Sequence, residues 1–401
     1  MLWILLAMAC AEPVAKSRVG PSDDADTGGD TADEPVVEGC RATPAAANRD
    51  RLVLIAHPYD ASGGQADTWA TWRLDEGGEL SNLDHPFTLG RRFDGTMRWT
   101  PDGQVGVVAQ DDGSLGVVHI GTGGLPDVVH ASLTGDFYAG DVSVDPSGEW
   151  LWITDSNTVD NGGGIYRAAI DCTDGTLSDI TPVFSARLPT RLLVSPHHMD
   201  RAVVVGTEGA GAADAASEVH LLERAGASFS LADSGMAFDD DGASFMDAAL
   251  SRDGSIALIA DNSAWSGVDH RVAAVPINED LGAPQVSSEI FDPTGFVVAP
   301  HDDVALVLSA YGDAVFILDL TPGSDTPMQV RGELSYEGAR PELPGGGAVV
   351  PRGSLAGLAL VSEVGGIRSI WMQGEGEVTD LGRTSTGSGY DSIVGAIGLQ
   401  P

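Results

Sequence analysis

The chain has 401 residues and a formal net charge of −38, with 59 Asp and Glu against 21 Lys and Arg. Such an acidic chain repels nucleic acid and offers no polybasic segment to a membrane surface, so we expect neither to be bound directly. The 52 Gly, 22 Pro and 42% hydrophobic residues, with short β-rich runs and few helical patterns, favour a turn-rich all-β fold.

The first ten residues form an apolar stretch from Leu2 to Ala9, followed by Cys10. A bilayer crossing takes about 20 apolar residues, so this stretch is too short to span and is typical of a signal peptide. The small residues before Cys10 resemble a bacterial lipoprotein signal. That resemblance implies export and a lipid on Cys10 that anchors the protein to a membrane of the cell envelope. The alternative is an ordinary signal peptide with an incidental cysteine.

Residues 11–47 carry many Asp, Gly and Thr and no apolar period, so we expect a disordered acidic tether. Cys40 lies near the end of this tether, and Cys172 follows a predicted outer strand. If Cys10 is acylated, these two cysteines are an even pair in an oxidising compartment. A Cys40–Cys172 disulfide is therefore a hypothesis, and the sequence leaves open whether they pair.

A tight turn recurs through the rest of the chain, first as Thr100-Pro101-Asp102-Gly103. Pro presets the first turn position, and Asp or Gly suits the next. The equivalent of Pro101 recurs at intervals of 45 to 56 residues, at Pro146, Pro196, Arg252, Pro300 and Pro351. After each turn comes a nearly continuous apolar run, as in a strand buried on both faces. These runs are Val105–Gln110, Trp150–Asp155, Ala202–Thr207, Ile256–Asp261, Val304–Ser309 and Leu358–Glu363.

A third strand follows each apolar run, and the fourth strands are less distinct. Six units are visible, and the seventh is divided between the two ends of the domain. Ala396–Pro401 would form the inner strand of the blade that begins with Leu52–His57. Units of this length, closed by the termini, predict a seven-bladed β-propeller of four-stranded blades over residues 48–401. A β-solenoid is the alternative, but it uses shorter repeats.

Blade topology brings the first residues of the inner strands and the last residues of the second strands to one face. Seven polar residues are candidates for a ligand-binding rim there: His57, Asp141, Asp155, Arg191, Glu208, Asp247 and Asp261. Gly295, Gly346 and Ala396 at the opposite sector would leave room for a ligand to enter. The polar residues could simply solvate strand ends, hold Ca²⁺ through carboxylate oxygens, or form an acid–base pair beside Arg191 for an anionic substrate.

Several pieces resemble the lactonase-like and YVTN-repeat seven-bladed propellers. They are Leu151 to Asn157, Ile165-Tyr166-Arg167, Asp174 to Ser178 and Gly77 to Ser81. The resemblance implies the fold over residues 50–401 and, as one option, lactone hydrolysis. Lactonases of this type often begin inner strands with Pro-Arg-His, whereas this chain has Pro189-Thr190-Arg191 at one such position.

No catalytic motif and no obligatory cofactor can be identified. The leading hypothesis is a monomeric, lipid-anchored propeller that binds a protein or small molecule at the cell envelope without catalysis. A lactonase-like hydrolase that uses the sector of Asp141, Arg191 and Asp247 is the first alternative. A Ca²⁺-stabilised structural envelope protein is the second.

Overall fold

A computed structural model describes residues 45–130, 137–157, 163–186, 188–195, 200–207, 217–226, 228–238, 245–261, 270–301, 303–321 and 328–401. The chain divides into the units Met1–Val37 and Glu38–Pro401, and all of the described residues belong to the second. The predicted signal segment, Cys10, Cys40 and nearly all of the tether therefore lie outside the described residues.

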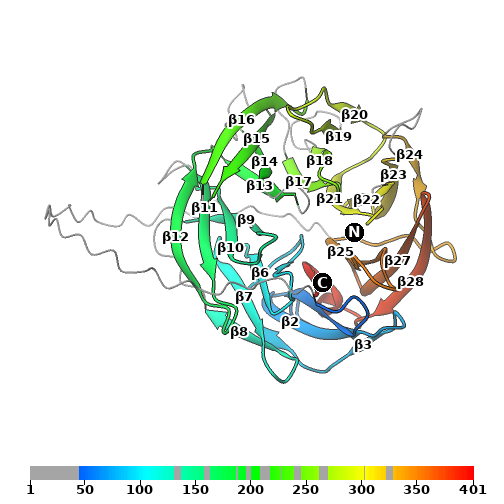
Figure 1. Cartoon of the computed structure of the whole chain (residues 1–401). Helices are drawn as coiled ribbons and strands as arrows, with labels where there is room; N and C mark the ends of the chain where they lie inside the picture. Colours follow the sequence, from blue (N-terminus) through cyan, green and yellow to red (C-terminus); the bar gives the residue numbers. More distant parts are fainter. Residues whose placement is uncertain are drawn as a thin grey trace, which may run out of the picture. The chain divides into compact units, whose positions relative to one another are not determined.

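Seven antiparallel sheets form the seven blades of a β-propeller and surround a central axis (Figure 1). Each blade has four strands, listed here from the axis outward. Blade 1 contains β29 (Ile397–Leu399), β1 (Arg51–Tyr59), β2 (Gln65–Leu74) and β3 (Leu80–Asn82), and β4 (Phe87–Thr88) also pairs with β2. Blade 2 contains β5 (Arg98–Trp99), β6 (Val105–Ala109), β7 (Leu115–Ile120) and β8 (Pro126–His130). Blade 3 contains β9 (Ala139–Val144), β10 (Trp150–Asp155), β11 (Gly164–Ile170) and β12 (Leu177–Phe184).

The remaining four blades repeat this order. Blade 4 contains β13 (Pro189–Val194), β14 (Arg201–Thr207), β15 (Ser217–Ala225) and β16 (Ser228–Met236). Blade 5 contains β17 (Phe245–Leu250), β18 (Ile256–Asp261), β19 (Arg271–Pro276) and β20 (Gln285–Ser287). Blade 6 contains β21 (Pro293–Val298), β22 (Val304–Ser309), β23 (Ala314–Asp319) and β24 (Val330–Glu333). Blade 7 contains β25 (Gly346–Val349), β26 (Leu358–Glu363), β27 (Gly366–Gly374) and β28 (Glu377–Ser385). A short 3₁₀ helix, η2 (Tyr390–Ser392), precedes β29.

The ring closes as the sequence predicts. The last strand, β29, pairs with β1 antiparallel, with Leu399 opposite Val53 and Ile397 opposite Ile55. Blade 1 therefore takes its inner strand from the C-terminal end of the domain and its other strands from the N-terminal end. This arrangement leaves no unpaired inner edge where the ring begins and ends.

The recurring turn joins each inner strand to its second strand. In blade 2 the Thr100 hydroxyl donates to Asp102 Oδ1 at 2.6 Å, and the Gly103 N–H donates to the Thr100 carbonyl at 2.8 Å. Gly103 has φ of +72° and its equivalent Gly148 has φ of +74°, a region that residues other than Gly seldom adopt. Gly254 and Gly353 at the equivalent position also have positive φ, so this conformation accounts for Gly in four of the six turns; His198 and Asp302 in the other two lie outside the described residues.

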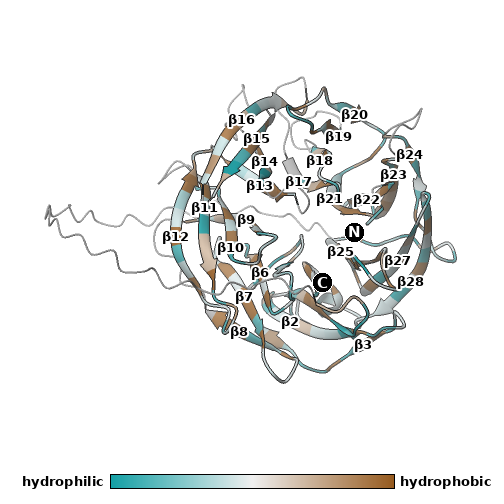
Figure 2. Cartoon of the chain, in the orientation of Figure 1, coloured by the Kyte–Doolittle hydropathy of each residue, from teal (hydrophilic) through white to brown (hydrophobic). Residues whose placement is uncertain are grey.

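The core is distributed between the blades. Each pair of adjacent blades shares one cluster of buried apolar residues, so the described residues contain seven such clusters around the ring. The second strands are buried on both faces, whereas the outer strands β12, β16 and β28 have mostly exposed or partly exposed residues. Figure 2 shows hydrophobic residues recurring in every part of the ring, with hydrophilic residues among the outer strands.

Candidate functional site

The inner strands begin at one face of the ring, which we call the mouth face. Their recurring turns lie at the opposite face, the turn face. At the mouth face a small hollow opens between the inner strands, with room for about 10 Å³. Five of its lining residues stand five positions before the Pro101-equivalent residue of the recurring turn, in or just before an inner strand: Thr96, Arg191, Asp247, Gly295 and Gly346. A hollow of this size admits one water-sized group.

Arg191 and Asp247 form an ion pair at this hollow. Arg191 Nε donates to Asp247 Oδ1 at 2.8 Å, and the two side chains are 11% and 18% exposed. Arg191 Nη1 also donates to the carbonyl of Thr190 at 2.9 Å, and the N–H of Phe296 donates to Asp247 Oδ2 at 3.2 Å. Strands β13, β17 and β21 therefore fix the pair from three neighbouring blades.

Burial and charge act on this pair in different directions. Burial raises the pKa of Asp247 above its ordinary value, although the charge of Arg191 opposes this effect. Burial lowers the pKa of Arg191, but the negative charges of Asp141 and Asp247 outweigh it and raise that pKa overall. Asp141 thus lies within electrostatic reach of Arg191, so the structure brings together the three residues at the centre of the predicted rim.

Asp141 is the unusual member of the group. It lies on β9 opposite Thr154, whose hydroxyl oxygen accepts a hydrogen bond from the Asp141 N–H at 2.8 Å. Only 9% of the residue is exposed, and Asp141 Oδ2 is buried without a hydrogen-bond partner among the described residues. A buried carboxylate oxygen without a donor is rare because its desolvation is not offset. Asp141 Oδ2 can therefore accept a hydrogen bond from a ligand hydroxyl or amine.

Further residues near the hollow were not predicted from the sequence. Asp94 lines it, and its charge and that of Arg98 act on the Arg191–Asp247 pair. Guanidinium groups and carboxylates are mixed here: Arg92, Arg98 and Arg191 lie among Asp94, Asp141 and Asp247, and the Arg91–Asp111 ion pair lies beside Arg92 and Asp94. The positions of Asp94 and Arg98, on either side of Thr96 at the start of β5, could have indicated their location.

Aromatic side chains border the mouth beside Asp94. The rings of Tyr59 and Phe93 lie 5.4 Å apart between centroids. The Tyr311 N–H donates to Asp292 Oδ2 at 2.8 Å, and burial raises the pKa of Tyr311, with the charges of Asp292, Tyr59 and Asp94 adding to that rise. Tyr311 is nevertheless 55% exposed. These three rings, Tyr59, Phe93 and Tyr311, are called the aromatic border below. No periodicity in the sequence marked them.

The carboxylates at the ends of the second strands have structural partners. Asp155 is fully buried, and its Oδ1 accepts the N–H groups of Tyr138 at 3.1 Å and Asn157 at 2.9 Å. Asp261 is also fully buried, and its Oδ2 accepts from Arg271 Nε at 3.1 Å and Nη2 at 2.6 Å. Both carboxylates therefore hold strand ends in place, which is the simplest of the roles considered from the sequence.

The remaining predicted residues do not join the cluster. His57 lies on blade 1, and its Nδ1 is 2.7 Å from the Asp391 carbonyl oxygen. Burial lowers the pKa of His57, which favours the neutral ring. Glu208 lies outside the described residues. Cys172 is disulfide-bonded. Cys40, its predicted partner, is outside the described residues, so that pairing stays a prediction.

Of the small residues expected to leave room for a ligand, Gly295 and Gly346 line the hollow, but backbone from neighbouring blades takes up the space beside Gly346 and Ala396. A Cβ on Gly346 would lie 2.2 Å from the Gly95 carbonyl oxygen. The Met97 N–H donates to the Ile397 carbonyl at 2.9 Å, and Ala396 is fully buried. The sector where blades 7, 1 and 2 meet is thus closed by direct contact between inner strands.

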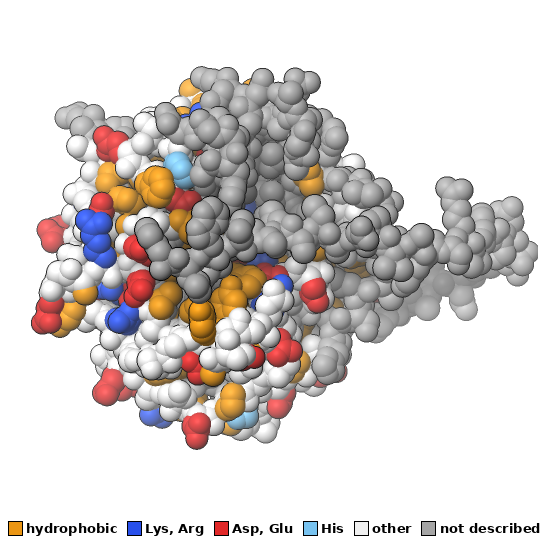
Figure 3. All heavy atoms as spheres, turned by 180° about the vertical axis from the view of Figure 1, so that it is seen from behind, with side chains coloured by type: hydrophobic (Ala, Val, Ile, Leu, Met, Phe, Trp, Pro, Cys, Tyr) orange, Lys and Arg blue, Asp and Glu red, His pale blue; other side chains and the backbone are white. Residues whose placement is uncertain are grey.

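In the face of the molecule that Figure 3 shows, acidic side chains are scattered widely, with few basic ones between them. Within the described ranges, no group of three or more His, Cys, Asp or Glu side chains is arranged to hold a metal ion. The described part of the chain also contains no helix with the length and hydrophobicity that a bilayer crossing requires.

No family model matches the sequence, and no curated protein matches it. Solved structures do match. A periplasmic gluconolactonase from Pseudomonas aeruginosa has a TM-score of 0.59 at 13% identity, covering 88% of this chain and 99% of its own. A protein described as a putative 6-phosphogluconolactonase from Bacteroides fragilis has a TM-score of 0.57 at 13% identity, covering 87% and 98%. The hydrazine synthase of Kuenenia stuttgartiensis has a TM-score of 0.54 at 14% identity, covering 83% and 97%. The chain therefore has the fold of the lactonase-like seven-bladed propellers, a fold that also occurs in proteins of quite different chemistry.

Proposed function

We propose that this propeller binds a small, neutral, hydroxyl-rich ring compound, such as a sugar or sugar lactone, at its mouth face. The observation that carries the proposal is Asp141 Oδ2, a buried acceptor beside the Arg191–Asp247 pair that has no donor within the described ranges. Asp141 does not itself line the hollow, so a ligand hydroxyl would have to reach its Oδ2 beside Arg191 to supply the missing hydrogen bond. Bonds to a charged group contribute about 1.5–3 kcal/mol each, so this single contact would matter for affinity.

The charge balance favours a neutral ligand over an anion. Arg191 is already bonded to Asp247 and to a backbone carbonyl, and carboxylates lie among the guanidinium groups at the mouth. A phosphorylated or carboxylated compound would meet no excess of positive charge here, and it would approach a chain of net charge −38. The mixed charge at the mouth therefore disfavours the anionic substrate that the sequence left open.

The aromatic border supports a ring-shaped ligand. Because the hollow admits only one small group, the rest of the ligand would lie outside it, where Tyr59, Phe93 and Tyr311 offer apolar ring faces. Aromatic faces favour contact with the C–H face of a sugar ring, while carboxylates accept from its hydroxyl groups. Aromatic rings and carboxylates together therefore favour a ligand that has both an apolar C–H face and hydroxyl groups.

A second candidate, hydrolysis of a sugar lactone at the same place, is favoured by the pKa of Asp247, which burial raises. Water would add to the lactone carbonyl, the ring C–O bond would break, and the product would be the open hydroxy acid. Asp141 would accept the proton of the water, and Asp247 would return a proton to the leaving ring oxygen. The names of the Pseudomonas and Bacteroides structures support this candidate by analogy of fold alone.

We further propose that the protein is exported and held at the cell envelope by a lipid on Cys10. The apolar run before Cys10 supports this location, as does the acidic segment at residues 11–47. The Pseudomonas structure named as periplasmic supports export. The location suits a receptor for small molecules that have crossed the outer barrier of a cell.

Isothermal titration with glucose, methyl β-glucoside and myo-inositol, compared with gluconate, tests the binding proposal. We expect saturable binding of at least one neutral ring, weaker binding of gluconate, and a 10- to 100-fold loss in Asp141→Asn, which matches about 1.5–3 kcal/mol. Asp112→Asn is the matched control, because Asp112 is exposed and holds only its own turn. Absence of saturable binding by any neutral ring, or equal effects of the two substitutions, would contradict the proposal.

A pH-stat assay with glucono-δ-lactone separates binding from hydrolysis. Turnover above the spontaneous rate that disappears in both Asp141→Asn and Asp247→Asn would assign the hydrolase. Saturable binding without turnover would assign a receptor.

A further inference from the structure

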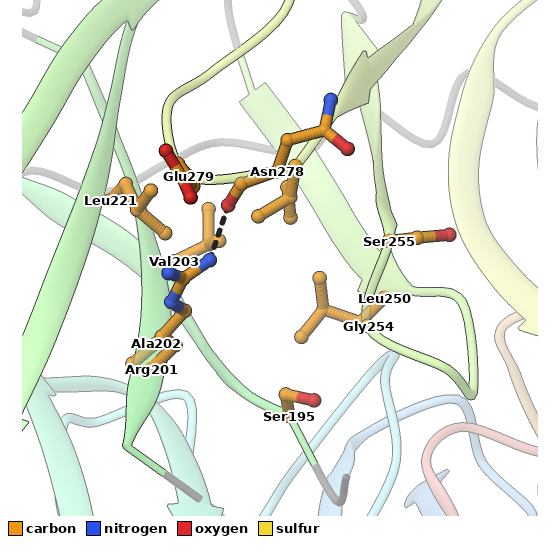
Figure 4. A pocket seen from close by; sticks show the side chains of 11 residues that line it. Ser195, Arg201, Ala202, Val203, Leu221, Leu250, Gly254, Ser255, Asn278 and Glu279 are labelled. Atoms are coloured by element: carbon orange, nitrogen blue, oxygen red, sulfur yellow. Dashed lines mark hydrogen bonds between the residues drawn. The ribbon is translucent and has the colours of Figure 1, made fainter. Parts of the chain in front are cut away.

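A second cavity, of about 400 Å³, opens between blades 4 and 5 at the turn face (Figure 4). The turn face is the face of the ring opposite the mouth. Its walls are mostly aliphatic, and its edge carries Arg201, Glu279 and two serines. The lining residues are Ser195, Arg201, Ala202, Val203, Leu221, Leu250, Gly254, Ser255, Ile277, Asn278 and Glu279. The volume is in the range of sites that hold small organic molecules, about 300–1,000 Å³.

The cavity exists because blade 4 breaks the repeat at one position. The first residue of the second strand is apolar in five blades: Val105, Trp150, Ile256, Val304 and Leu358. Each of these packs into the cluster shared with the next blade. Blade 4 has Arg201 there instead, and its Nη1 donates to the carbonyl of Asn278 in blade 5. Arg201 reaches along the edge of the interface, so the volume that an aliphatic side chain fills elsewhere stays open.

Blade 1 also begins its second strand with an arginine, but strand pairing places Leu52 rather than Arg51 at the equivalent position, since Val53 lies opposite Leu399 as Ala202 lies opposite Val194. Arg51 is 1% exposed, and its guanidinium donates to the carbonyls of Ala47, Arg49 and Arg352. It is therefore a structural group bonded on several sides. Arg201 is partly exposed and has one such bond, and the described residues offer it no ion-pair partner. Its remaining N–H groups are available at the edge of the cavity.

The apolar wall and the cation together define the ligand chemistry. Val203, Leu221 and Ile277 belong to the buried cluster between blades 4 and 5, yet they border this cavity. Burying apolar ligand surface against them is favourable, and a guanidinium binds a carboxylate through two parallel hydrogen bonds. Figure 4 shows Glu279 beside Asn278 and the Arg201 guanidinium, at the same edge. The negative charge of Glu279 disfavours a ligand with two carboxylates there.

We propose that this cavity binds a small monocarboxylic acid, with its apolar body between blades 4 and 5 and its carboxylate on Arg201. The site is separate from the mouth and does not depend on the function proposed for it. A hydrophobic body of about ten heavy atoms matches the space. The protein would thus recognise two unrelated kinds of molecule on its two faces.

Isothermal titration with three probes of equal shape tests this proposal: 3-phenylpropionate, 3-phenylpropanol and 3-phenylpropylamine. We expect saturable binding of the acid, at least tenfold weaker binding of the alcohol, and no measurable binding of the amine. Failure of the acid to saturate would overturn the proposal. Equal affinity for the alcohol, or tighter binding of the amine, would show that Arg201 is not the anchor and would also overturn it.

Arg201→Ile removes the anchor and restores the side chain that the same position of blade 5 uses. We expect this variant to lose binding of the acid while melting at the same temperature as the wild type or higher, which separates loss of the site from loss of the fold. Arg340→Ile is the control, because that side chain is 67% exposed and does not line the cavity. Asp141→Asn should bind the acid normally. Unchanged binding in Arg201→Ile would refute the assignment.

Discussion

Replacement of Arg368 by Met tests whether the carboxylates at the ends of the second strands are structural groups. Arg368 Nε and Nη2 donate to the two carboxylate oxygens of Glu363 at 3.0 and 3.1 Å, and Nη1 donates to Asp380 Oδ2 at 2.8 Å. The three side chains are 2%, 0% and 4% exposed. Methionine keeps the length and removes every donor, so two buried carboxylates would lose their shared partner.

Removing one member of a buried ion pair costs about 3–5 kcal/mol, because the remaining charge stays desolvated. We therefore expect Arg368→Met to lower the free energy of unfolding in urea by about that amount at pH 7. Burial already raises the pKa of Glu363 above its ordinary value, although Arg368 opposes it. Without Arg368 the folded state would hold a proton on Glu363 at still higher pH. The penalty should thus shrink as pH falls through that raised pKa.

Arg383→Met is the matched control. Arg383 Nε lies 3.6 Å from the same carboxylate, but the side chain is 39% exposed. A solvated pair of this kind contributes less than about 1 kcal/mol. A loss below about 1 kcal/mol in Arg368→Met, or an equal loss in the two variants, would refute the structural role of these carboxylates.

Three further outcomes follow from the same contacts. Asp261→Asn should lower the free energy of unfolding by roughly 1–3 kcal/mol, because Arg271 loses its buried carboxylate partner. Ligand binding at the mouth should be unchanged, and a reduced affinity there would place Asp261 in the site. Burial raises the pKa of Asp247 above that of the unfolded chain, so wild type should gain stability over Asp247→Asn as pH falls through the raised pKa, and parallel melting curves would contradict this. Deletion of residues 397–401 should lower the melting temperature sharply, because β1 loses its inner partner; an unchanged melting temperature would refute closure by β29.

Most of the fold could be predicted because its units repeat. The strand predicted at Ile256–Asp261 has those bounds in the structure, and Arg51–Tyr59 extends the predicted Leu52–His57 by three residues. Turn chemistry explains this success, since Gly103 and its equivalents need a conformation that few other residues adopt. The outer strands were indistinct because their faces are largely exposed and impose no apolar pattern.

The candidate site could be predicted only in part. Register in the repeat placed Arg191 and Asp247 at adjacent strand heads, and the structure joins them. Register does not reveal partners, so it could not show that Asp261 is paired with Arg271. Nor does it reveal packing between blades, so the contact of Gly346 with backbone was missed.

The cavity at the turn face illustrates a signal that was present in the sequence. Aligning the first residues of the second strands would have set Arg201 against apolar residues in five other blades. The predicted strand begins at Ala202, so Arg201 falls just outside it and is not compared with its equivalents. A residue that departs from an internal repeat is thus a candidate site residue, because the residues that do repeat show which side chains the packing between blades requires.

The most direct test of the mouth as a ligand site is a crystal structure of the protein soaked with the neutral ring compound that binds most tightly in titration. We expect one ligand hydroxyl group within hydrogen-bond distance of Asp141 Oδ2, and the ring against Tyr59, Phe93 or Tyr311. A ligand bound elsewhere, with Asp141 Oδ2 still without a donor, would contradict it.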